Sequence, residues 1–146
     1  MEESIKMNAA ILSAFDKKGK DIRTYSPLTL AYIGDAVYDL VIRSLVVAGA
    51  NRPANDLHRI TVKYVNAGAQ AKMVEALMGE LTEEEEAVYR RGRNSKPHTT
   101  AKNATVEDYL KATGFEAVIG YLYLKDEEDR VFTLVKKGME LAGLSL

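Results

Sequence analysis

Apolar residues recur along most of this chain at the three- and four-residue spacing of an α-helix, and no stretch shows the strict alternation of a half-buried strand. Capping residues and glycines divide this pattern into segments. The pattern predicts an all-α fold. The predicted helices are Ile5 to Phe15, Pro27 to about Val47, Pro53 to Gly79, Thr82 to near Gly92, Thr105 to Leu124 with an interruption at Thr113 and Gly114, and Glu127 to Leu141.

Two of these helices begin with capping sequences. Ser26 and Pro27 have the form of an N-cap followed by proline at the first helical position. Thr82 and Glu85 have the spacing of a capping box, and the acids from Glu83 to Glu86 suit the positive end of a helix dipole. We interpret this acidic run as a helix start.

Two predicted helices are apolar on nearly every side, yet each carries one carboxylate and one glycine. The first contains Gly34 and Asp35, and the second contains Glu116 and Gly120. A carboxylate in apolar surroundings needs an ion pair, hydrogen bonds or a metal. A glycine inside a helix costs about 1 kcal/mol relative to alanine, which a close backbone approach offsets.

If these two helices cross at their glycines, Asp35 and Glu116 converge. Such a pair suits a hard cation such as magnesium, which takes one or two protein carboxylates together with water and substrate phosphate. The alternative is that each acid is neutralised separately by a buried arginine or hydroxyl.

Other kinds of catalytic site fit the sequence less well. A carboxylate-bridged di-iron bundle requires Glu-x-x-His, whereas Asn55 and Ser95 stand three residues before His58 and His98. We interpret His58 as a packed or hydrogen-bonded residue of an amphipathic helix. No nucleophile elbow and no glycine-rich phosphate loop is present, so covalent catalysis is disfavoured.

A basic segment from Arg90 to Lys102 contains five Lys or Arg residues and no acid. Arginines mixed with Asn, Ser and Thr suit contacts to phosphates, although a charge run also forms ordinary solvated surface. Since the chain has 20 Lys and Arg against 21 Asp and Glu, nucleic-acid affinity has to come from local clustering. The candidate RNA-binding residues are Arg90, Arg91, Arg93, Asn94, Lys96 and Lys102.

Length and composition favour one small domain. The chain has 146 residues, 47% of them hydrophobic, which we divide into an N-terminal extension (1–24) and one domain (25–146). The absence of cysteine removes disulfides and fits a cytoplasmic location. The charged N-terminus predicts no secretory signal, and no apolar run reaches transmembrane length, so we expect no membrane association.

The segment Tyr32 to Val37 resembles the signature helix of the ribonuclease III catalytic domain, and Phe115 to Leu124 resembles its second catalytic helix. The resemblance covers about residues 25–143. Four segments resemble the Mini-III branch of this family, which is bacterial and lacks the double-stranded-RNA-binding domain: Leu30 to Asp35, Val65 to Ala71, Arg91 to Asn94, and Thr113 to Leu124.

This resemblance implies an all-helical homodimer that cleaves double-stranded RNA with magnesium, or with manganese as a substitute. It also implies a role in maturing the ends of 23S ribosomal RNA precursors. Asp35 and Glu116 are the expected catalytic and metal-binding residues. Asp39, one turn after Asp35, is expected to orient a water or to pair with Arg43 behind the metal ligands.

The chain departs from the larger family members at two positions. These carry metal-binding acids where Ala31 and Thr113 stand, which leaves the number of metal ions open. The departures also permit an alternative, a catalytically inactive module of the same fold that binds double-stranded RNA or serves in assembly. A dimeric scaffold that does not bind RNA is a third hypothesis.

Overall fold

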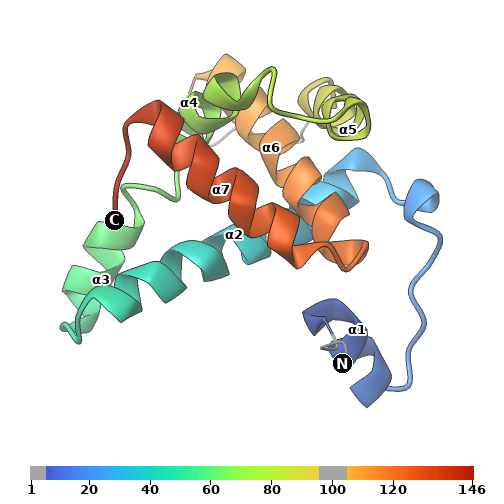
Figure 1. Cartoon of the computed structure of the whole chain (residues 1–146), viewed down its shortest axis with the longest axis horizontal. Helices are drawn as coiled ribbons and strands as arrows, with labels where there is room; N and C mark the ends of the chain where they lie inside the picture. Colours follow the sequence, from blue (N-terminus) through green and yellow to red (C-terminus); the bar gives the residue numbers. More distant parts are fainter. Residues whose placement is uncertain (1–5, 96–104) are drawn as a thin grey trace.

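The computed structural model describes residues 6–95 and 105–146, and all regular secondary structure in these ranges is helical. The all-α prediction is therefore confirmed. In chain order (Figure 1) the elements are α1 (Met7–Ala14), the 3-10 helix η1 (Ile22–Thr24), α2 (Pro27–Gly49), α3 (Ala54–Thr61), α4 (Ala67–Leu77), α5 (Glu83–Arg93), α6 (Val106–Leu124) and α7 (Glu128–Ala142).

Helices α2 and α6 form the centre of the fold, and α4, α5 and α7 pack around α6. Tyr38 of α2 and Phe115 of α6 are fully buried, and their rings meet edge to face with centroids 6.0 Å apart. The Tyr38 hydroxyl donates to the carbonyl oxygen of Tyr64 at 2.7 Å. The central pair is therefore held by apolar packing with its polar group satisfied.

The backbones of α2 and α6 touch where the helices cross. A Cβ atom at Gly34 would lie 1.8 Å from the carbonyl oxygen of Glu116, and one at Gly120 would lie 1.9 Å from that of Leu30. Both distances are far below van der Waals contact, so only glycine fits at either position. The hypothesis that these helices cross at their glycines is confirmed.

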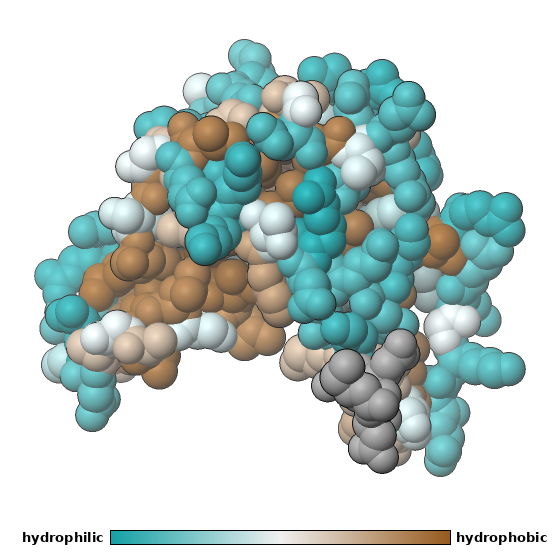
Figure 2. Space-filling model, viewed as in Figure 1, coloured by the Kyte–Doolittle hydropathy of each residue, from teal (hydrophilic) through white to brown (hydrophobic). Residues whose placement is uncertain are grey.

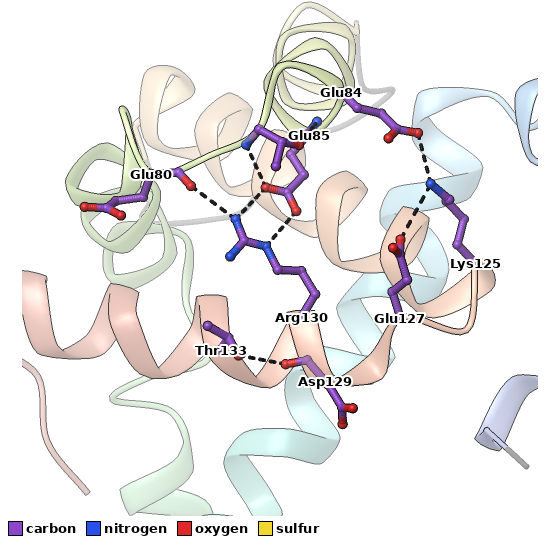
Figure 3. Close-up of polar contacts among 9 residues, drawn as sticks. Glu80, Glu84, Glu85, Lys125, Glu127, Asp129, Arg130 and Thr133 are labelled. Atoms are coloured by element: carbon purple, nitrogen blue, oxygen red, sulfur yellow. Dashed lines mark hydrogen bonds and ion pairs between the residues drawn. The ribbon is translucent and has the colours of Figure 1, made fainter. Parts of the chain in front are cut away.

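The two predicted caps are present. The Ser26 hydroxyl accepts a hydrogen bond from the Thr29 backbone N–H at 3.2 Å. Thr82 and Glu85 form a reciprocal capping box at the start of α5. Figure 3 shows that the Glu85 side chain also meets Arg130 of α7, with two N···O distances of 2.8 Å. Because Glu85 is only 3% exposed, this bidentate pair fixes α5 on α7.

The prediction of one helix from Pro53 to Gly79 is wrong, because this region forms two helices, α3 and α4. The break follows from the Asn66 side chain. Its amide group donates to the carbonyl oxygen of Val62 at 2.8 Å, while its carbonyl oxygen accepts from the backbone N–H of Ala69 at 2.8 Å. The Asn66 side chain therefore bonds backbone groups near the end of α3 and the start of α4, which in a continuous helix would bond to other backbone groups.

The interruption predicted at Thr113 and Gly114 is also wrong, because α6 runs through both residues. The Thr113 hydroxyl donates to the carbonyl oxygen of Tyr109 at 2.9 Å, within the helix. A Cβ atom at Gly114 would lie 2.8 Å from the carbonyl oxygen of Tyr89. This glycine therefore permits close packing of α5 on α6 and does not end the helix.

One apolar face of α2 is not covered by the residues that the structure describes. With α7 and Met7 of α1 it borders a groove of about 780 Å³ whose lining includes Val37, Leu40, Val41, Leu45 and Phe132. Hydrophobic surface is visible over this region in Figure 2. The groove explains why α2 is apolar on nearly every side, although the helix is buried on one side only.

No helix in ranges 6–95 and 105–146 combines the length and hydrophobicity needed to cross a lipid bilayer.

We expect Gly34→Ala to destabilise the fold by more than about 3 kcal/mol, because its methyl group would overlap the Glu116 carbonyl oxygen. Gly49→Ala in the same helix is the matched control, since a Cβ there meets no atom within 4 Å. That change should be neutral or should stabilise by about 0.5–1 kcal/mol. Urea unfolding measures both values, and equal effects would contradict the close helix crossing.

Candidate active site

A pocket of about 350 Å³ opens where α2, α4 and α6 meet, next to the glycine crossing. It contains both acids that the sequence singled out, Asp35 from α2 and Glu116 from α6. The other lining residues are Leu28, Ala31, Tyr32, Ala67, Gln70, Tyr109, Ala112 and Thr113. The helix crossing therefore brings two acids from distant parts of the chain into one cavity.

The two acids have different surroundings. Glu116 is partly buried, whereas Asp35 is exposed, and its neighbour Tyr32 is 80% exposed. The expectation that both acids lie in apolar surroundings is thus wrong for Asp35, because it lies beside the helix contact and faces solvent. Only Glu116 needs compensation from the protein.

Burial raises the pKa of Glu116 to about 8, and the nearby Asp35 carboxyl group adds to the increase. A hydrogen bond from the Gln70 side chain acts in the opposite direction. Glu116 therefore retains its proton near neutral pH. A bound cation would relieve the repulsion between the two acids.

The chemistry of the pocket fits a hard divalent cation. The pocket offers carboxylate oxygens, which are the ligands that magnesium and manganese prefer, and leaves room for water. Within the ranges that the structure describes, no three or more Asp, Glu or His side chains are arranged so that they could hold a metal ion together. Magnesium commonly binds through one or two carboxylates, which is the number of acids that the pocket offers.

Ala31 and Thr113 line this pocket, at the positions where the larger relatives were expected to carry acids. The Thr113 hydroxyl donates to the Tyr109 backbone and so is already engaged. Neither residue adds charge. The protein charge available to a cation therefore comes from the two acids alone among the lining residues.

Sequence reasoning missed Gln70 as a candidate site residue. Its side chain is only 4% exposed, and its amide Nε2 donates to Oε2 of Glu116 at 3.2 Å. The only signal in the sequence was its place in the segment Val65 to Ala71, which resembles the Mini-III branch. No pattern of spacing connects a residue of α4 with an acid of α6.

Asp39 lies one turn after Asp35 but does not line the pocket. It forms an ion pair with Arg43, with Asp39 Oδ2 2.9 Å from Arg43 Nε. Of the two alternatives predicted for Asp39, the structure shows the pairing with Arg43. His58 is exposed on α3 and is also outside the pocket.

The described part of the basic segment forms the C-terminal end of α5. Arg90 lies 3.8 Å from Glu86 in an exposed ion pair. Arg91 and Arg93 are exposed, and Asn94 is the C-cap residue. The remaining candidates, Lys96 and Lys102, lie outside the described residues.

We expect the metal-free protein to lose stability as the pH rises from about 4.5 to about 8. In this range folded Glu116 holds a proton that the unfolded chain releases, because its pKa rises from 4.5 to about 8 on folding. The loss amounts to at most about 1.4 kcal/mol per pH unit and ends above the folded-state pKa.

Urea unfolding in a chelator at several pH values measures this dependence. Glu116→Gln has no such proton to lose, so its stability should fall less over the same range. Parallel curves for the two proteins would show that Glu116 titrates normally in the fold.

Comparison with known proteins places the chain in a family. A model of the ribonuclease III domain matches residues 28–127. A Mini-ribonuclease 3 from a Thermoanaerobacter species is 49% identical over 120 residues, which cover 82% of this chain and 84% of that protein. A Mini-ribonuclease 3 from Enterococcus faecalis is 48% identical over 126 residues, which cover 85% and 96% of the two chains.

The fold is similar to that of a solved structure as well. A crystal structure of a protein from Fusobacterium nucleatum superposes with a TM-score of 0.74 at 33% identity, and the match covers 81% of this chain and 96% of that one. The match to the domain model spans α2 through α6, and thus includes both acids of the pocket. This chain belongs to the ribonuclease III family.

Proposed function

We propose that this protein is a magnesium-dependent endoribonuclease that cleaves double-stranded RNA, with manganese as a possible substitute ion. The observation that carries the proposal is the convergence of Asp35 and Glu116 in one pocket at the glycine crossing. Membership of the ribonuclease III family supports the same reaction. The acids are oxygen ligands suited to a hard cation.

In this proposal Asp35 and Glu116 hold the cation. When bound, magnesium supplies a Lewis acid that activates water and neutralises charge on the scissile phosphate. Asp35 is exposed to solvent, from which RNA would approach, whereas Glu116 is partly buried and is bonded by Gln70 inside the fold. Ala31 and Thr113 contribute no charge, so water and the RNA phosphate would have to supply the remaining ligands of a bound ion.

The proposed RNA contacts come from the basic segment. Arg90, Arg91, Arg93 and Asn94 stand at the end of α5, and Lys96 and Lys102 follow in sequence. Arginine and asparagine side chains suit phosphate contacts, which position a duplex without reading its sequence. Because A-form RNA is recognised mainly through its shape and 2′-hydroxyls, we expect weak sequence preference.

We also propose that the protein acts as a homodimer. The apolar groove between α2 and α7 supports this, since its lining includes exposed Leu40, Leu45 and Phe132. A second copy would cover these side chains.

The natural substrate that we propose is the precursor of 23S ribosomal RNA, processed in the cytoplasm.

Incubation of the protein with long double-stranded RNA and magnesium should yield shorter fragments, and a chelator should prevent the cleavage. Asp35→Asn should abolish cleavage but preserve binding, because it removes one metal ligand from the pocket rim and leaves α5 unchanged. Gel electrophoresis separates the outcomes. Intact duplex under all conditions would favour an inactive RNA-binding module, which Ala31 and Thr113 permit.

The matched variant for this assay is the double change Arg91→Ala and Arg93→Ala. It should weaken duplex binding and reduce the salt dependence by about 0.9 in log–log slope for each phosphate that is no longer neutralised. This double variant should still cleave the duplex when the enzyme is at saturating concentration.

If Asp35→Asn instead cleaves duplex RNA at the wild-type rate, the metal site has been assigned to the wrong acid.

We expect Leu40→Glu to convert the protein to a monomer, because a charged side chain in the apolar groove would oppose its burial. Val106→Glu is the control, since Val106 is 61% exposed and does not line the groove. Sedimentation equilibrium measures the mass of each variant. A wild-type monomer at micromolar concentration, or an unchanged dimer in Leu40→Glu, would argue against this interface.

A further inference from the structure

Gln70 combines deep burial with a polar contact to the candidate metal ligand. Within the described ranges it is one of four buried polar or charged residues, together with Thr61, Glu85 and Thr113. The hydroxyls of Thr61 and Thr113 donate to carbonyl oxygens in their own helices, and Glu85 pairs with Arg130. Gln70 alone in this set directs its side chain to an acid of the pocket.

The contact is set by the start of α4. The Asn66 side chain caps this helix. Gln70 follows one turn later, and its backbone N–H donates to the backbone carbonyl oxygen of Asn66 at 3.1 Å. From this fixed turn the Gln70 side chain reaches Glu116 on α6. The cap at Asn66 therefore positions the amide group that contacts the acid.

Other compensation for Glu116 is sparse. Within residues 6–95 and 105–146, neither Asp35 nor Glu116 forms an ion pair with a Lys or Arg side chain. Among the amide, hydroxyl and basic side chains of these ranges, the Gln70 amide is the one that donates to Glu116, at Oε2. The other polar neighbour of Glu116 is the Asp35 carboxyl group. A carboxylate that accepts such a bond at one oxygen is restricted in orientation, and the bond leaves that carboxylate able to offer its other oxygen to a cation.

We propose that Gln70 is a positioning residue that orients the Glu116 carboxylate for a divalent cation and thereby sets the affinity of the site for that ion. This inference rests on the proposed metal-dependent function. The proposal adds a third helix, α4, to a site whose two acids come from α2 and α6. A neutral amide suits this role, because it donates to the acid without competing for it as a lysine or arginine would.

The test compares manganese binding to the full-length protein and to Gln70→Leu, by calorimetry in the absence of RNA. Leucine has a similar volume but cannot donate a hydrogen bond. Loss of a hydrogen bond to a metal-ligating group typically weakens metal affinity by about 10- to 100-fold, and we expect a decrease of this size. The control is Thr61→Val, which removes a buried hydroxyl of similar exposure, 5%, outside the pocket.

A second readout separates positioning from a purely structural role. Gln70→Leu should require a higher magnesium concentration for duplex cleavage, and its rate should approach that of the wild type when magnesium saturates the site. Its affinity for duplex RNA in chelator should be unchanged. A structural role alone would lower thermal stability and leave the magnesium requirement as it is.

The outcomes are distinct. Wild-type manganese affinity in folded Gln70→Leu, or an equal loss of affinity in Thr61→Val, would overturn the role of Gln70. If Gln70→Leu does not fold, Gln70→Asn takes its place, since its amide is one methylene too short to reach Glu116 and the same loss is expected. Absence of manganese binding and of cleavage in the wild type would instead refute the proposed function itself.

Discussion

The architecture of this protein depends on the contact between the backbones of α2 and α6 at Gly34 and Gly120. Packed helices are usually about 8–10 Å apart because side chains separate them. Here a single methyl group at either glycine would overlap a carbonyl oxygen of the other helix. The loss of helix propensity at two glycines is offset by a close crossing, and this crossing places Asp35 and Glu116 at the same pocket.

The pocket between α2, α4 and α6 leaves one partly buried acid, Glu116, without a basic partner in the described residues. Burial and the proximity of Asp35 disfavour the ionised form of Glu116, and no lysine or arginine in the described residues pairs with either acid. Elsewhere the fold neutralises a buried acid fully, as Glu85 shows with its two contacts to Arg130. The contrast between these two glutamates indicates that Glu116 is left incompletely compensated, as expected of a ligand for a cation.

The sequence predicted those parts of the structure that local interactions determine. The caps at Ser26 and Thr82 depend on residues within one turn, and the pairing of Gly34 and Gly120 followed from their cost inside apolar helices. Contacts between distant segments were less accessible. Gly114 looked like a helix end because its packing partner, Tyr89, lies on another helix, and Gln70 was missed because its acid is on α6.

The most direct test of the proposed cation site is a crystal structure of the protein with manganese, located by its anomalous scattering. We expect a peak in the pocket between α2, α4 and α6, within coordination distance of an oxygen of Asp35 and of Glu116, about 2.0–2.3 Å. Manganese bound only at other positions, or carboxylates that point apart with no ion between them, would contradict it.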